Sequence, residues 1–231
     1  TLPVGWSNAD VGATGGAGSA SFANGTYTVS GAGTDVWGTA DALQYAYRSL
    51  SGDGSIVARV ASVEAVNAWT KAGVMIRSSL AANSAQGFML VAASASKGTN
   101  YQRRLTTGGT SVGNTGTLAT APRWVKLVRT GNTIDGYEGP DGVNWTLVGS
   151  STFSMPDNVL IGLGVSSHVA GTNAAATFDN VTISAAGPPP PPPNVPPTVS
   201  ISSPAGGATF TAPATLSIAA NAADSDGTVS R

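Results

Sequence analysis

The feature that most constrains the fold of this chain is a proline run near its C-terminal end. Residues 187–197 read GPPPPPPNVPP. Proline fixes the backbone φ angle and has no N–H group, so such a run favours an extended polyproline II conformation and cannot join a core. At about 3.1 Å per residue it would hold its neighbours roughly 30 Å apart. The sequence therefore predicts a β-type domain over residues 1–186, a polyproline linker over 187–197 and an incomplete second domain over 198–231.

Period-2 alternation of apolar and polar residues recurs through the first part. Val74 and Ile76 oppose Met75 and Arg77, and similar runs follow at even spacing, separated by turn signals such as Asn24-Gly25. About twelve short strands are expected, and they predict an all-β, antiparallel two-sheet sandwich. In residues 159–166 one face carries glycine and serine, which indicates either close packing by a neighbouring loop or the floor of a groove.

Composition excludes several classes of function. Charged residues make up 10% of the chain and the formal net charge is −1, so there is no basic footprint for nucleic acid. No apolar run is long enough to cross a membrane, so membrane insertion is not expected. Cysteine is absent, which excludes disulfides and thiolate chemistry. The first residue is Thr1, consistent with removal of a signal peptide or with trimming.

Several segments together resemble a known family. The residues that carry the resemblance are 19–31, 35–41, 50–60, 71–77, 102–104, 124–129 and 177–182. They are similar to non-catalytic modules of the concanavalin A-like lectin/glucanase superfamily, which are appended to secreted bacterial glycosidases, lyases and surface proteins. The resemblance implies a jelly-roll sandwich of two curved sheets with a concave face, and sugar binding by association. Residues 196–231 resemble the start of a bacterial immunoglobulin-like domain.

No catalytic constellation is evident. Glycosidases need two closely placed carboxylates, but the two glutamates, Glu64 and Glu138, lie in no such pattern. The single histidine, His168, is not accompanied by a nucleophile elbow. The sequence therefore predicts a protein that is not an enzyme.

Sugar binding needs aromatic faces for stacking and planar polar side chains for hydroxyl groups. The candidate residues are Trp37, Trp69, Arg77, Gln102, Arg104 and His168. If the faces of their strands coincide, the two arginines and Gln102 would line the concave sheet, where a guanidinium suits a hydroxyl pair or a sugar carboxylate. The alternatives are that Trp69 covers one end of the sandwich and that the arginines are solvated strand residues paired with nearby acids. Trp124 and Trp145 are expected to pack in the core or between the sheets.

No cofactor is required. A structural calcium ion is considered because calcium sites use carboxylates and loop carbonyls, and Asp10 and Asp179 are the candidate ligands.

The expected function is that of a non-catalytic carbohydrate-binding module of a secreted or cell-surface bacterial polysaccharide-active enzyme, which binds glycan on a concave β-sheet face. Its partners would be a polysaccharide or oligosaccharide and a catalytic domain in the same parent chain. The alternative is a structural or adhesive subunit of a surface assembly, in which strands of residues 198–231 pair with a neighbouring chain.

Overall fold

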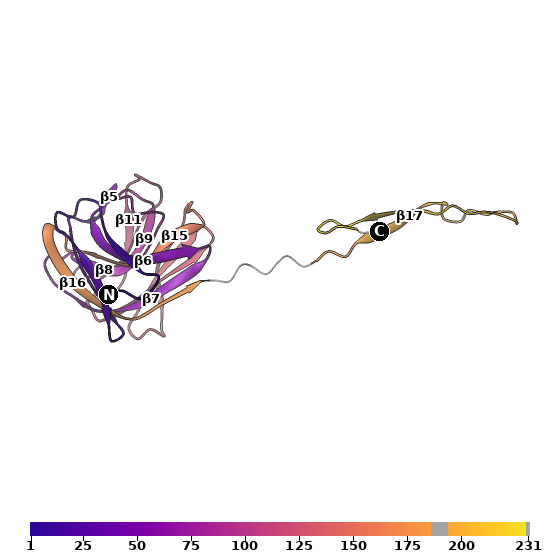
Figure 1. Cartoon of the computed structure of the whole chain (residues 1–231). Coiled ribbons are helices and arrows are strands. Elements are labelled where there is room, and N and C mark those ends of the chain that lie inside the picture. Colours follow the sequence, from indigo (N-terminus) through magenta and orange to yellow (C-terminus); the bar gives the residue numbers. More distant parts are fainter. Residues whose placement is uncertain (186–193, 230–231) are drawn as a thin grey trace. The chain divides into compact units, whose positions relative to one another are not determined.

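The structure is a computed structural model that describes residues 1–185 and 194–229. The chain divides into two compact units, residues 1–188 and 189–231, which are considered separately (Figure 1). The described residues form strands, turns and coil without a helix, which confirms the all-β prediction. The predicted polyproline linker over 187–197 falls largely outside the described residues, so the predicted domain boundaries stay a prediction.

The first unit is built from two antiparallel seven-stranded sheets. Sheet A contains, in spatial order, β1 (Ser7–Val11), β6 (Leu43–Ser51), β15 (Asn158–Ser166), β8 (Lys71–Arg77), β9 (Gln86–Ala92), β10 (Thr99–Arg104) and β11 (Val112–Thr115). Sheet B contains β14 (Thr146–Thr152), β13 (Thr133–Gly139), β12 (Arg123–Thr130), β7 (Gly54–Val63), β16 (Val169–Ala185), β3 (Thr26–Gly33) and β2 (Ser19–Ala23). A short hairpin, β4 (Val36–Trp37) and β5 (Ala40–Asp41), is separate from both. The predicted two-sheet sandwich is therefore confirmed.

The main core lies between the sheets. Val74 and Ile76 of sheet A and Val125 and Leu127 of sheet B are fully buried members of one apolar cluster. Because strand side chains alternate between faces, these inward residues fix which neighbours point away from the core. Met75 and Arg77 must therefore lie on the other face of sheet A, called here its outer face.

The outer face of sheet A is also buried in part. Tyr45, Met75, Phe88 and Leu90 form a second apolar cluster, and Val36 of the β4–β5 hairpin belongs to it. The Tyr45 hydroxyl donates a hydrogen bond to the Met75 carbonyl oxygen at 3.0 Å, and burial raises the pKa of Tyr45. The hairpin therefore covers one part of this face.

The glycines of β15 are close-packed and do not floor a groove. A Cβ at Gly162 would lie 2.0 Å from the Ala46 carbonyl oxygen of β6. A Cβ at Gly164 would meet the Leu43 side chain at 3.0 Å and the Phe88 ring at 3.4 Å. Of the two interpretations of this face, close packing is the correct one, but the packing groups belong to strands β6 and β9 and not to a loop.

Trp124 and Trp145 do not lie between the sheets, so that prediction is wrong. Trp124 alternates with buried Val125, and both tryptophans are half-buried. The Lys126 ammonium lies 4.3 Å from the Trp145 ring centroid and 4.5 Å from that of Tyr137. The two indoles therefore belong to the outer face of sheet B.

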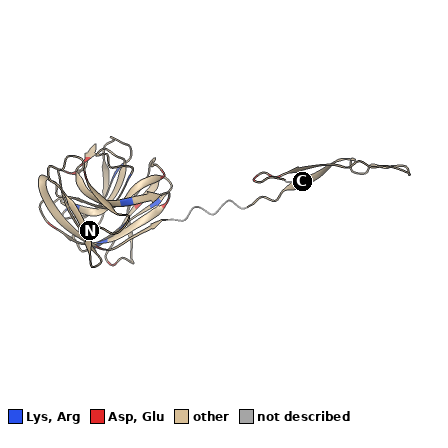
Figure 2. Cartoon of the chain, viewed as in Figure 1, with Lys and Arg blue, Asp and Glu red and all other residues tan. Residues whose placement is uncertain are grey.

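The second unit contains one described two-stranded sheet, β17 (Thr198–Ser203) and β18 (Ala219–Ala223). Every residue of both strands is exposed. Within the described ranges no helix is long and apolar enough to span a membrane. Charged residues are few and are dispersed over the first unit (Figure 2).

Candidate functional site

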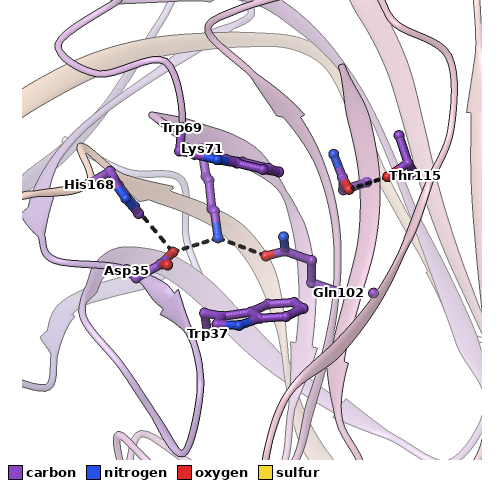
Figure 3. A pocket seen from close by; sticks show the side chains of 9 residues that line it. Asp35, Trp37, Trp69, Lys71, Gln102, Thr115 and His168 are labelled. Atoms are coloured by element: carbon purple, nitrogen blue, oxygen red, sulfur yellow. Dashed lines mark hydrogen bonds and ion pairs between the residues drawn. The ribbon is translucent and has the colours of Figure 1, made fainter. Parts of the chain in front are cut away.

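A hollow of about 440 Å³ opens on the outer face of sheet A, beside the β4–β5 hairpin (Figure 3). Its lining comes from the hairpin region, from β8, β10 and β11, and from the loops that precede β8 and β16. The lining residues are Asp35, Trp37, Trp69, Lys71, Asn100, Gln102, Gly113, Thr115 and His168. This hollow is called the cleft below. Four of the six predicted sugar-binding residues lie in it.

Two tryptophans form opposite walls of the cleft. Trp37 is on β4 and is 40% exposed, and Trp69 lies in the loop before β8. Figure 3 shows their indoles on either side of the Lys71 ammonium, which lies 5.8 Å from the Trp37 ring centroid and 5.4 Å from that of Trp69. The two tryptophans are 32 positions apart in the chain, and the fold brings them together in one cleft.

A tight turn sets the position of Trp69. The Asn67 side-chain oxygen accepts the Trp69 N–H at 2.9 Å, and the Asn67 N–H donates to the Thr70 hydroxyl at 2.9 Å. The same hydroxyl donates to the Ser167 carbonyl oxygen at 2.9 Å, next to His168. Such local hydrogen bonds from Asn and Thr side chains stabilise turns. They tie the loop of Trp69 to the loop of His168.

Lys71 forms the floor of the cleft and is only 2% exposed. Its ammonium donates to Asp35 Oδ1 at 2.5 Å, Gln102 Oε1 at 2.9 Å and the Val36 carbonyl oxygen at 3.2 Å. An ammonium has three protons, so these acceptors use all of them. Burial lowers the pKa of Lys71, and the neighbouring Asp35 carboxylate opposes that shift.

The Lys71 contact also orients Gln102. Since Gln102 Oε1 accepts from Lys71, the amide nitrogen Nε2 is the Gln102 group left facing the cleft, as Figure 3 shows. No described residue accepts a hydrogen bond from it. Gln102 therefore offers a donor at the floor.

Asp35 and His168 line one side. Asp35 Oδ1 accepts the Lys71 proton and the Val36 N–H at 2.7 Å, and the His168 Nδ1 lies 3.4 Å from the same oxygen. Asp35 Oδ2 receives no hydrogen bond from the described residues. The cleft thus combines two aromatic walls with a free donor and a free acceptor.

Arg77 and Arg104 do not line the cleft, so their predicted role as sugar contacts is corrected. Both side chains lie on the predicted face of sheet A but are 0% exposed. The Arg104 guanidinium binds both oxygens of Asp41, at 2.6 and 2.9 Å, and Arg77 lies 3.4 Å from the same carboxylate. The physical reason is that the β4–β5 hairpin lies over this part of sheet A and shields the arginine side chains from solvent. The alternative interpretation, solvated arginines paired with nearby acids, is correct for the pairing with Asp41 and wrong for the exposure to solvent, because both side chains are buried.

Arg104 instead holds the hairpin that carries Trp37. It donates to the Trp37 carbonyl oxygen at 3.2 Å and to the Gly38 carbonyl oxygen at 3.3 Å. The Ser111 hydroxyl donates to the same Gly38 oxygen at 2.9 Å. Buried charges are tolerated when hydrogen bonds compensate them, as they do here.

The two candidate calcium ligands lie on different sheets and have other partners. Asp10 of β1 accepts the Gly18 N–H with both oxygens at 3.1 Å, and Asp179 of β16 pairs with Arg59 at 2.7 Å. The described residues contain no group of three or more His, Cys, Asp or Glu side chains placed to hold a metal ion. The calcium prediction therefore gains no support from these two aspartates.

Sequence reasoning missed five cleft residues, which are Asp35, Lys71, Asn100, Gly113 and Thr115. A signal for Lys71 existed, because it shares the parity of Arg77 on one strand and therefore its face. Thr115 follows from the β10–β11 pairing, in which it lies opposite Asn100. The β10–β11 pairing is not visible in the sequence pattern alone.

Comparison with solved structures defines the class of fold. The matching chains include a carbohydrate-binding module and GH43 proteins. The carbohydrate-binding module CBM66 from Bacillus subtilis is 18% identical, with a TM-score of 0.52, covering 78% of this chain and 96% of that one. These identities establish likeness of fold.

Two further structures give the range of proteins that share the fold. A functionally unknown protein from Saccharomyces cerevisiae is 16% identical, with a TM-score of 0.58, covering 75% of this chain and 98% of that one. The Bacteroides ovatus protein Xyloglucan PUL GH43B is 15% identical, with a TM-score of 0.54, and the match covers 79% of this chain but only 37% of that protein.

The sequence comparisons concern the second unit. Residues 197–231 match the family model described as a bacterial Ig domain. No curated protein matches the chain by sequence.

Proposed function

We propose that the first unit is a non-catalytic carbohydrate-binding module of a secreted bacterial protein that acts on polysaccharides. The observation that carries the proposal is the cleft, in which Trp37 and Trp69 stand on opposite sides of a polar floor. Aromatic rings provide large apolar faces with little conformational freedom to lose, and a few convergent polar groups fix the orientation of a ligand. A sugar ring, with apolar C–H faces and hydroxyl groups at its edge, matches this combination.

The polar groups suit hydroxyl recognition. Gln102 Nε2 is a donor and Asp35 Oδ2 an acceptor, and both belong to side chains already fixed through Lys71. A fixed side chain loses little entropy when a ligand binds. The likeness in fold to the Bacillus subtilis carbohydrate-binding module supports the same proposal.

The charged groups of the cleft favour binding over catalysis. Glycoside hydrolysis generally uses two carboxyl groups on either side of the scissile bond. Asp35 is the only carboxylate among the cleft residues, and it is paired with Lys71. Glu138 is held elsewhere by Arg123 at 3.2 Å and by two threonine hydroxyls.

In this proposal the module works outside the cell, tethered to a catalytic domain of the same parent chain. Holding the glycan nearby raises its effective concentration for that domain without any new catalytic group. The proposed module comprises residues 1–186, joined by the segment 187–197 to the Ig-like segment 198–231. No metal ion is needed for it.

The test is binding of the intact chain to a panel of neutral and acidic polysaccharides by affinity gel and calorimetry. We expect at least one to bind with a Kd below 1 mM. Trp37→Ala and Trp69→Ala should each weaken that binding roughly tenfold, because each removes one stacking face.

Trp145→Ala is the matched control. Trp145 is also half-buried, but it lies on the outer face of sheet B, so its loss should leave affinity unchanged. Absence of binding across the panel would contradict the proposal. Equal effects of Trp69→Ala and Trp145→Ala would contradict the site.

A second candidate function is that of a structural or adhesive subunit that pairs strands with a neighbouring chain. It is favoured by the exposure of apolar side chains on and near β17 and β18, among them Val199, Ile201 and Ile218 at 67–74%. Exposed strand edges with apolar side chains are prone to such pairing. Light scattering tests it: a species near 22.8 kDa at high protein concentration would rule out self-assembly of this chain.

A further inference from the structure

The charges of the cleft are not equally accessible. The Lys71 side chain is 2% exposed, whereas that of Asp35 is 30% exposed. All three ammonium protons of Lys71 are already donated, but Asp35 Oδ2 has no partner among the described residues. A ligand in the cleft therefore meets the carboxylate before it meets the cation.

Lys71 is the only lysine or arginine among the residues that line the cleft. Arg77 and Arg104 lie on the same face of sheet A but are fully buried: Arg104 binds Asp41, and Arg77 donates to the Ser79 and Ala81 carbonyl oxygens at 2.7 Å and lies 3.4 Å from Asp41. His168 turns its Nδ1 toward Asp35 at 3.4 Å. Lys97, which is not a lining residue, lies with its ammonium 5.1 Å from the Trp69 ring centroid. Recognition of a carboxylate usually uses a free guanidinium or ammonium.

We infer that the cleft selects electrically neutral sugar rings over uronic acids, and that Asp35 is the residue that sets this selection. The inference rests on the proposed function. A neutral ring places its C–H faces against Trp37 and Trp69 and its hydroxyls on Gln102 Nε2 and Asp35 Oδ2. A ring with a carboxylate brings a second negative charge beside Asp35, where the cation of the floor, Lys71, has already donated all three protons, and like charges at close range repel.

The experiment measures affinities for matched pairs of oligosaccharides in which a carboxylate replaces a neutral ester or hydroxymethyl group on the same backbone. Suitable probes are methyl-esterified and de-esterified homogalacturonan fragments, and cello-oligosaccharides with their C6-oxidised uronates. Calorimetry is run at low salt, because screening weakens charge selection. It is run at pH 8, above the range in which histidine ordinarily gains its charge. In each pair that binds, the neutral member should bind at least tenfold more tightly.

Two variants test the role of Asp35. Asp35→Asn keeps an acceptor for Lys71 and Val36 but removes the negative charge, so the preference for the neutral member should fall at least threefold. Lys71→Met removes the compensating cation and should increase that preference. Asp179→Asn is the matched control, because Asp179 pairs with Arg59 on sheet B, and it should leave the ratio unchanged. Thermal unfolding of each variant confirms that it is folded.

The outcomes separate the two proposals. Equal or tighter binding of the acidic member by the unaltered chain overturns the inference and leaves the proposed function standing. An unchanged ratio in Asp35→Asn overturns the role of Asp35. If neither member of any pair binds, both the inference and the proposed function fail.

Discussion

Replacing Arg104 by methionine tests how the Trp37 wall is held. The methionine side chain has a similar length and no charge, so Arg104→Met removes the bonds at 2.6 and 2.9 Å to Asp41 and leaves that carboxylate buried. It also removes the donors to the Trp37 and Gly38 carbonyl oxygens. Removing one partner of a buried ion pair typically costs about 3–5 kcal/mol. Arg77, at 3.4 Å, remains as the one described residue still ion-paired with Asp41, so we expect a loss within that range.

The assay is thermal and urea unfolding of the intact chain, followed by tryptophan fluorescence. For a domain of this size each kcal/mol shifts Tm by roughly 2–4 °C, so Arg104→Met should lower Tm by roughly 6–20 °C. The matched control is Arg59→Met, which breaks the ion pair with Asp179 at 2.7 Å. That pair is partly exposed, and surface pairs contribute about 0–1 kcal/mol. If Arg104→Met costs no more than Arg59→Met, the buried cluster does not stabilise the hairpin and the reasoning is refuted.

Three other predictions concern the rest of the first unit. Gly162→Ala should lower the free energy of unfolding in urea by about 1–3 kcal/mol, because the new Cβ would lie 2.0 Å from a backbone oxygen. Gly164→Ala should lower it less, because the new Cβ would face the flexible Leu43 side chain. Equal losses in the two variants would contradict this packing. Burial alone would raise the pKa of Glu138, but hydrogen bonds from Thr117 and other groups, with the Arg123 charge, outweigh it and lower the pKa. Its ionised form therefore stabilises the fold above the unfolded pKa of about 4.3, and this contribution is lost as the pH falls through the lower folded value. The stability difference between the unaltered chain and Glu138→Gln should accordingly shrink below about pH 4, and a constant difference would contradict the assignment. Deleting residues 189–231 should leave the Tm of the first unit unchanged, because both of its apolar clusters draw only on residues before 184; a lower Tm would show that the second unit contributes to its stability.

The two-sheet sandwich could be predicted because alternation is a local signal. The pattern around Val74 and Ile76 placed Arg77 on the opposite face, and the observed register aligns Arg77 with Gln86 and Gln86 with Arg104. The faces of the strands were therefore predicted correctly.

What covers a face is not a local property. Asp41 is separated by 63 positions from Arg104, and nothing in the alternation indicates that a hairpin carries it onto that part of sheet A. The arginines were consequently predicted at an accessible surface, although they are buried. The prediction that Trp124 packs in the core or between the sheets is wrong for a related reason, because a large aromatic residue in an alternating strand was assumed to be buried.

The cleft was predicted in part. Trp37, Trp69, Gln102 and His168 were chosen for their chemistry, and the fold gathers all four. Lys71 was missed because its role is to orient Asp35 and Gln102, and that role depends on β8, β10 and the segment before β4 meeting at one place.

The most direct test of the cleft as the glycan-binding site follows the indole N–H signals of the five tryptophans by ¹⁵N NMR, during titration with the glycan that the panel identifies. We expect the Trp37 and Trp69 signals to shift and to saturate with one Kd, while those of Trp124 and Trp145 stay unchanged. Shifts at Trp124 or Trp145 with no change at Trp37 and Trp69 would contradict it, because the glycan would then bind the outer face of sheet B.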